Sequence, residues 1–466
     1  MMKKSIIALG ACSMVWLCTA AQTAGGGLDA AALGRLENSF GGTASDIALR
    51  NAVANNAIDK LAKNSANANK VDAHFTYRVK SNGITNQKRS GRCWLFTGLN
   101  VLRAQIMAKH GMGELYFSQN YNFFYDQLEK ANLFLQGIID TADRSADDKT
   151  VDWLFQNPIG DGGQFTGISD NFMKYGVVPA EVMHETESSE ATDKLRQLLG
   201  WRLREDGLRL REKHAAGATV AQLKEEKMKM LEGVYRILAL TLGEPVKEFT
   251  WTLRDKKGNA VSTKTYTPQS FYQEFAGNDL RNDYIMLMND PSREFYKLYE
   301  IDYDRHTYDG KNWTYINLPI DDIKEMAIAS LKDSTMMYFS CDVNKFLDRD
   351  RGYLDVNNYD YGSLFGTKFG MNKKERILTH ASGSTHAMTL MAVDLDKNGK
   401  STKWMVENSW GDGANKGHLI MTDEWFNEYM FRLVVNKKYA PAKVLSILKQ
   451  KPILLPAWDP MFAEDN

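Results

Sequence analysis

The chain has 466 residues, and its 58 lysines and arginines balance 58 aspartates and glutamates, so its formal net charge at pH 7 is zero. Its hydrophobic fraction of 43% excludes a wholly disordered chain. The neutral balance argues against a dedicated nucleic-acid-binding protein, which needs a surplus of lysine and arginine to bind phosphates. Four cysteines in a chain of this length exclude a disulfide scaffold and a cysteine-rich zinc array.

Residues 1–21 predict a secretory signal peptide. Lys3 and Lys4 precede an apolar run, and small residues follow it, which is the pattern of a cleaved export signal. A transmembrane anchor would need about 18–20 unbroken apolar residues, and this run is shorter and interrupted. We therefore expect cleavage before Gln22, export to a periplasm or to the cell exterior, and no membrane span in the mature chain.

The first half of the mature chain is predominantly helical in pattern. Residues 22–80 form a lead-in of small residues, expected as helix and surface wrap. From Cys93 onward apolar residues recur at spacings of three and four, which predicts a helix with Ser90 as its candidate N-cap. Residues 192–240 carry two apolar stripes on a strongly charged background, which is typical of helices with solvated outer faces.

The later part of the chain is richer in predicted strands. A hairpin is expected over residues 249–266, around the turn signal Lys257-Gly258-Asn259. Helices early and strands late indicate an α+β architecture with two lobes, and a cleft between lobes is the natural place for a site. Further strands are predicted at residues 336–341, 386–394, 403–408, 418–422 and 432–435.

Cys93 is the first residue that points to chemistry. A cysteine at the beginning of a helix meets unpaired backbone N–H groups and the positive end of the helix dipole, which stabilise a thiolate. The alternative is that Cys93 is a small buried apolar residue. Gln87 lies six residues upstream, beyond a basic loop, and its amide could fold back beside the thiol as an oxyanion donor.

His386 and Asn408 complete a possible catalytic set. His386 opens a predicted strand, and an amide oxygen from Asn408 would fix its tautomer and aim the other ring nitrogen at a thiolate. Trp410, two residues beyond Asn408, could screen that hydrogen bond from water. The alternatives are a structural histidine and a strand that simply ends in the turn after Trp410.

The order of Gln87, Cys93-Trp94, His386 and Asn408-Ser409-Trp410 resembles the papain-like cysteine peptidases. The resemblance implies the papain-like fold of a helical lobe and a β-barrel-like lobe. It also implies that Gln87 is the oxyanion glutamine, Cys93 the nucleophile, His386 the general base, and Asn408 its orienting partner. The string Asp161-Gly162-Gly163-Gln164 is similar to the strip whose backbone lines the substrate cleft in that family, so Gly162, Gly163 and Trp410 are expected at the substrate site.

The match is closer to the bleomycin hydrolase and aminopeptidase C branch, which the motifs at residues 86–96, 385–389, 416–419, 421–425 and 455–461 resemble. Members of this branch carry helical insertions and assemble as homohexameric rings. A C-terminal arm lies in their cleft, where its terminal carboxylate, here that of Asn466, holds the free amine of the substrate. The implied division is a helical lobe at 81–185, a mainly helical insertion at 186–300, a β-rich lobe at 301–440 and an arm at 441–466.

The sequence therefore predicts a cysteine aminopeptidase that acts on peptides by acyl transfer, with no metal and no cofactor. The alternatives are a papain-like endopeptidase with an open cleft, or a catalytically silent ring of the same fold that binds peptides or nucleic acid; no specific nucleic-acid partner is predicted. A disulfide between Cys93 and Cys341 would abolish the chemistry, and Cys341 is expected in the core instead. The other histidines, His306 among them, show no ligand-like spacing and are interpreted as structural or surface residues.

Overall fold

The computed structural model describes residues 26–68, 72–459 and 461, so the signal peptide expected at residues 1–21 lies outside the described part of the chain. The chain divides into two units, Met1–Ala62 and Lys63–Asn466. The described part of the first unit is helical, with α1 (Ala30–Ser39), α2 (Ala44–Asn55) and α3 (Ile58–Ala62). Asp29 caps α1 by accepting a hydrogen bond from the backbone N–H of Ala32, and Thr43 and Asp46 form a capping box on α2.

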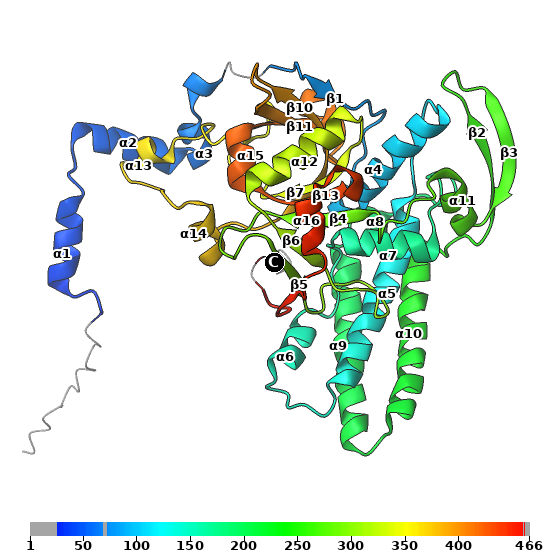
Figure 1. Ribbon diagram of the computed structural model, residues 1–466. Coiled ribbons are helices and arrows are strands. Elements are labelled where there is room, and N and C mark those ends of the chain that lie inside the picture. Colours follow the sequence, from blue (N-terminus) through cyan, green and yellow to red (C-terminus); the bar gives the residue numbers. More distant parts are fainter. Residues whose placement is uncertain (1–25, 69–71, 460, 462–466) are drawn as a thin grey trace, which may run out of the picture. The chain divides into compact units, whose positions relative to one another are not determined.

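The helices of the second unit confirm the helical pattern predicted from Cys93 onward and within residues 192–240. Three long helices, α5, α9 and α10, run side by side (Figure 1) because their apolar stripes face one another. Leu199 and Leu203 of α9 and Val234 and Leu238 of α10 are completely buried. The helices are α4 (Cys93–His110), α5 (Gln119–Asp140), α6 (Lys149–Gln156), α7 (Phe165–Tyr175), α8 (Glu187–Glu190), α9 (Asp193–Ala215), α10 (Val220–Leu242), α11 (Pro268–Phe275), α12 (Ile320–Lys332), α13 (Tyr361–Phe365), α14 (Lys373–Leu378), α15 (Asp423–Tyr429) and α16 (Ala442–Ile447).

The strands confirm the predicted hairpin and the predicted strand-rich region, with ends that move by at most two residues. The hairpin strands β2 (Phe249–Arg254) and β3 (Ala260–Tyr266) pair with each other. The remaining strands of the described residues form one twelve-stranded mixed sheet. They are β1 (Tyr77–Arg78), β4 (Tyr284–Met288), β5 (Lys297–Ile301), β6 (Thr314–Asn317), β7 (Met337–Cys341), β8 (Leu347–Asp348), β9 (Tyr353–Leu354), β10 (His386–Leu395), β11 (Ser401–Glu407), β12 (His418–Thr422), β13 (Met430–Asn436) and β14 (Ile453–Leu455).

The order of strands places the beginning of β10 beside the end of β11. The path through the sheet is β14-β5-β6-β4-β13-β7-β10-β11-β12-β9-β8, with β1 paired to β10. Because β10 and β11 are antiparallel, with Thr389 opposite Glu407, residues just before Thr389 and just after Glu407 share one edge of the sheet. On its other side β10 pairs with β7, where His386 lies opposite Cys341. The sheet also includes β4 and all but the last residue of β5, which lie inside the range 186–300. The division into lobes stays a prediction.

Helix α4 lies between two hydrophobic cores. One core is formed mainly by helices α4, α5, α7, α9 and α10, and the other by the sheet with α12 and α15. Leu99 and Leu102 of α4 contribute to the first core, whereas Ala104 contributes to the second. A helix that is buried on most of its surface keeps its N-terminus in a fixed place relative to both cores.

The predicted N-cap of α4 is wrong. The N-cap residue is Arg92, and its side chain makes no capping hydrogen bond. The Ser90 hydroxyl instead donates to the Gln87 carbonyl, at 2.6 Å, and accepts a hydrogen bond from Nε of Arg92. Ser90 therefore closes the turn between Gln87 and the helix rather than pairing with the N–H groups of the first helical turn.

Candidate active site

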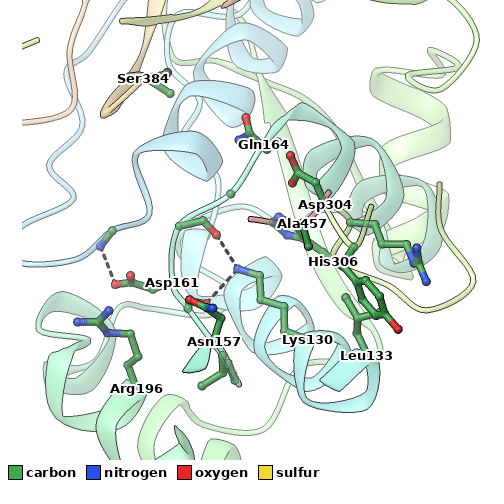
Figure 2. Close-up of a pocket in the computed structure, with 18 of the residues that line it drawn as sticks. Lys130, Leu133, Asn157, Asp161, Gln164, Arg196, Asp304, His306, Ser384 and Ala457 are labelled. Atoms are coloured by element: carbon green, nitrogen blue, oxygen red, sulfur yellow. Dashed lines mark hydrogen bonds between the residues drawn. The ribbon is translucent and has the colours of Figure 1, made fainter. Parts of the chain in front are cut away.

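A cavity of about 490 Å³ opens beside the N-terminus of α4. Its lining comes from distant parts of the chain: α4, α5, α6, residues 157–164, residues 302–306, β7, the beginning of β10, and residues 457–458. Figure 2 shows side chains from several of these segments around the same space, among them Lys130, Asp161 and His306. Gln87, Cys93, Gly162, Gly163 and His386 all line this cavity, so five of the predicted site residues meet there.

Cys93 is the first residue of α4 and is half-buried at the cavity. The unpaired N–H groups of the first helical turn and the helix dipole favour a thiolate at this position. The neighbouring Arg92 is completely buried and forms a salt bridge to Glu185 at 2.8 Å. Its positive charge is therefore already paired with a carboxylate.

Gln87 is held by hydrogen bonds at both its backbone and its side chain. Its backbone N–H donates to the carbonyl of Ser409 at 2.9 Å, and its side-chain Nε2 donates to the carbonyl of Ser90 at 2.7 Å. A primary amide carries two N–H groups, so one bond to Ser90 orients the amide and leaves a second donor. The side chain is buried and lines the cavity together with Cys93, as an oxyanion donor requires.

His386 and Asn408 form a hydrogen bond at the edge of the sheet. Nε2 of His386 lies 2.8 Å from Oδ1 of Asn408, and the same oxygen accepts the backbone N–H of Ser409 at 2.8 Å. Because Oδ1 only accepts, Nε2 must carry the proton, which leaves Nδ1 as the basic nitrogen of the neutral ring. The ring of Trp410 stacks on the ring of His386, with centroids 4.8 Å apart.

Burial lowers the pKa of His386 to about 4, because an imidazolium loses its hydration inside the protein. The hydrogen bond to Asn408 acts in the opposite direction, and the nearby positive charge of Arg349 lowers the pKa further. The ring is consequently neutral near pH 7 as long as no negative charge forms beside it. A thiolate beside the ring would favour the imidazolium, so the two groups can exchange a proton.

The glycine strip at residues 160–163 is fixed by a buried lysine. Nζ of Lys130 donates to the carbonyls of Gly160 and Gly162, at 3.0 and 2.6 Å (Figure 2), and pairs with Asp126 at 3.0 Å. A Cβ atom added to Gly163 would lie 2.3 Å from Cε1 of His306, whereas one added to Gly162 would meet nothing within 4 Å. Position 163 therefore needs glycine for close packing, and position 162 has open space beside it.

His306 belongs to the cavity wall, a location that the sequence does not reveal. Its Nδ1 lies 2.5 Å from Oδ1 of Asp126, and its ring meets the edge of Trp94 with centroids 4.8 Å apart. Although burial opposes ionisation, the charges of Lys130 and His306 lower the pKa of Asp126. The available signal was the pair of opposite charges Asp126 and Lys130, one helical turn apart on the same helix.

The C-terminal segment reaches the cavity. Ala457 and Trp458 line it, and the carbonyl of Met461 accepts a hydrogen bond of 2.6 Å from Arg432. Another nitrogen of Arg432 donates to Oε1 of Gln164 at 2.5 Å, so this arginine joins the segment to the residue that follows the glycine strip. The predicted amine-binding carboxylate of Asn466 lies outside the described residues and stays a prediction.

Two further predicted residues have clear positions. Trp410 stacks behind His386 and does not line the cavity, so its contact with substrate is not supported by its position. Cys341 is completely buried opposite His386 and forms no disulfide with Cys93, which confirms its place in the core. Burial raises the pKa of the Cys341 thiol well above its ordinary value.

In the described residues, no cluster of three histidine, cysteine or acidic side chains is suited to hold a metal ion, and no helix is both long and apolar enough to span a membrane.

Comparisons with known proteins agree with this geometry. The model of the peptidase C1-like family matches residues 27–462. Bleomycin hydrolase of Homo sapiens is 42% identical over 401 residues, which cover 84% of this chain and 88% of the relative. Aminopeptidase C of Lactobacillus delbrueckii subsp. lactis is 36% identical over 419 residues, which cover 89% of this chain and 93% of the relative.

A solved structure extends the similarity to three dimensions. The crystal structure of PepW from Lactobacillus rhamnosis has a TM-score of 0.90 and 38% sequence identity, and the match covers 94% of this chain and 99% of that chain. These findings confirm the papain-like fold and the cysteine aminopeptidase function, and none of them supports an endopeptidase or a silent ring. The chain belongs to the peptidase C1-like family, in the branch of bleomycin hydrolase and aminopeptidase C.

Proposed function

We propose that this cysteine aminopeptidase removes N-terminal residues from peptides through a Cys93 thiolate, with His386 as general base and acid. The observation that carries the proposal is that Cys93, at the N-terminus of α4, and His386, oriented by Asn408, open on the same cavity. A histidine in this role needs one ring nitrogen fixed by a hydrogen bond and the other free to accept a proton. The hydrogen bond from Nε2 to Oδ1 of Asn408 fixes the first nitrogen and leaves Nδ1 as the basic one.

The reaction proceeds by acyl transfer. The proton of the Cys93 thiol passes to Nδ1 of His386, and the thiolate sulfur attacks the carbonyl carbon of the first peptide bond. The second N–H of the Gln87 amide and the backbone N–H of Cys93 bind the developing oxyanion. The imidazolium of His386 returns its proton to the leaving amine, which departs as the shortened peptide, and the acyl group stays on sulfur. His386 then takes a proton from water, whose oxygen attacks the thioester carbon; the C–S bond breaks, the N-terminal amino acid leaves, and the proton on His386 returns to the Cys93 sulfur to restore the free enzyme.

The exopeptidase specificity that we propose depends on the C-terminal arm. The contacts of Arg432 to Met461 and to Gln164 support an arm that follows the cavity wall toward the substrate. The carboxylate of Asn466 would pair with the ammonium group of the substrate and block a longer chain. Export through residues 1–21 and assembly as a homohexamer are further proposals, which rest on the sequence pattern and on the family resemblance respectively.

Hydrolysis of an aminoacyl coumarin amide, compared with its N-acetylated twin, tests the proposed function. We expect cleavage of the free-amine substrate alone, under reducing conditions, and complete loss of cleavage in a Cys93→Ala variant. Equal or faster cleavage of the acetylated substrate would contradict the aminopeptidase specificity and indicate an endopeptidase. Cleavage of neither substrate by the reduced wild-type protein would contradict the catalytic proposal and favour a silent ring.

A further inference from the structure

One face of α4 contacts both chain neighbours of Asn408. Arg103 of α4 forms an ion pair with Glu407 at 2.5 Å, and Nδ2 of Asn100, one turn earlier, lies 3.4 Å from the hydroxyl of Ser409. These four side chains are at most 2% exposed. Residues 100 and 103 lie on the same side of a helix, so one helical face reaches the residue before Asn408 and the residue after it.

The same polar cluster holds the segment that carries Gln87. Arg103 donates to the carbonyl of Gly83 at 3.2 Å, and the hydroxyl of Thr85 accepts from Asn100 at 3.1 Å and donates to Ser409 at 3.0 Å. The backbone of this segment is bonded to the strand end as well, because the carbonyl of Thr85 accepts the N–H of Gly411 at 3.0 Å. The helix, the segment of Gln87 and the strand end with Asn408 therefore meet in one buried network.

Stability is a poor explanation for an ion pair in this place. Two buried charges lose their hydration, and the loss is recovered only when all their donors and acceptors are paired. Nε and Nη1 of Arg103 have no hydrogen-bond partner among the described residues. Buried ion pairs of this kind can often be replaced by apolar residues of similar volume with little or no loss of stability.

We propose that Arg103, Glu407, Asn100, Thr85 and Ser409, which we call the polar clamp, are positioning residues of the active site. The clamp fixes the positions of Asn408 and Gln87 relative to Cys93 at the beginning of α4. Because Asn408 bonds to His386, the clamp also fixes the position of the His386 ring. This inference rests on the proposed function, because it concerns the same catalytic set. It assigns the clamp a role in reaction geometry that is separate from its contribution to folding.

The double variant Arg103→Met with Glu407→Leu tests this role, since it removes both charges and keeps the volume. We expect kcat to fall about 10- to 100-fold, KM to stay within about threefold and the melting temperature to stay within about 4 °C. If the clamp only stabilises the fold, the double variant has a lower melting temperature, and its kcat at temperatures below that melting point equals the wild-type value. The control is Arg202→Met with Asp206→Leu, which removes a pair of 2.8 Å whose carboxylate is completely buried in α9, away from the cavity, and should leave kcat unchanged.

A second measurement makes the test independent of turnover. The rate at which iodoacetamide alkylates Cys93 is measured between pH 4 and 9 in the wild type, in the double variant and in Thr85→Val with Ser409→Ala, which removes only two hydroxyl groups. We expect the pH midpoint of this rate to move upward in both variants, because a displaced His386 no longer takes the thiol proton. Superimposable profiles in all three proteins would overturn the proposal. An inactive wild type would contradict the proposed function, and the alkylation profiles would still decide on the clamp.

Discussion

At the scale of single residues, the bond between Asn408 and His386 carries the orientation of the base. An Asn408→Ala variant loses the acceptor for Nε2, so the ring can adopt the other tautomer and rotate. We expect kcat to fall roughly 10²-fold with little change in KM. Asn408→Asp keeps an acceptor in place and should recover part of this loss, with the acid limb of the kcat profile moved to higher pH because a carboxylate favours the imidazolium. Equal losses in the two variants would contradict an orienting role.

The buried His386 also predicts a pH dependence of stability. Its pKa is lowered from 6.5 to about 4 by burial, so between these pH values the unfolded chain binds more protons than the folded one. The free energy of unfolding therefore rises with pH across this window, and the stability conferred by the neutral ring is lost as pH falls from 6.5 to 4. The full pKa shift of His386 corresponds to a change of about 3 kcal/mol in the free energy of unfolding.

This dependence is measured by urea unfolding at pH 4.5 and 7 in the Cys93→Ala protein, which has no thiolate beside the ring. We expect a smaller difference between the two pH values when His386→Gln is added, because glutamine does not titrate. Other groups contribute equally to both proteins and cancel in the comparison. An unchanged difference would show that the folded protein does not resist protonation of His386.

At the scale of structural elements, the two adjacent glycines of the strip make a matched pair. Gly163→Ala would place a Cβ atom 2.3 Å from His306 and 2.8 Å from Trp94, whereas Gly162→Ala has open space. We expect Gly163→Ala to lower kcat/KM at least 10-fold and to destabilise the protein by about 1–3 kcal/mol, because a close-packed wall must shift. Gly162→Ala should keep the wild-type melting temperature. Similar losses of stability in both variants would contradict this packing argument.

Local patterns predicted the helix from Cys93, the helices within residues 192–240 and seven of the fourteen strands in the described residues. Together with the family resemblance they also predicted five residues that line the cavity. The periodicity after Cys93, the strand that begins at His386 and the strand that ends just before Asn408 depend on neighbours in the chain, which a sequence contains. Ser90 was misassigned because a hydroxyl can cap a helix or close the preceding turn, and only the backbone path decides between them. His306 was not placed at the cavity because its partners, Asp126 and Trp94, are 180 and 212 residues away in the chain. Such contacts leave no mark on local spacing.

At the scale of the whole molecule, Arg432 connects the sheet, the glycine strip and the C-terminal segment. Arg432→Met removes its hydrogen bonds to Gln164 and to the carbonyl of Met461. We expect the ratio of cleavage of the free-amine substrate to that of the acetylated substrate to fall at least 10-fold, because an arm that is no longer held at Met461 excludes blocked chains less well. The comparison is a variant that lacks residues 462–466. A ratio that stays at the wild-type value in both variants would show that the arm does not set specificity.

The separation of the catalytic residues along the chain has a consequence for biosynthesis. Cys93 precedes His386 by 293 residues, Asn408 by 315 and Arg432 by 339, so it is synthesised well before them. At about 5–20 residues per second, roughly 15–60 s pass between the synthesis of Cys93 and that of Asn408. During this interval the nascent chain has a nucleophile without a base, and the sheet that would hold the base is incomplete. The enzyme is thus inert toward neighbouring polypeptides until the strands that position its base have been made.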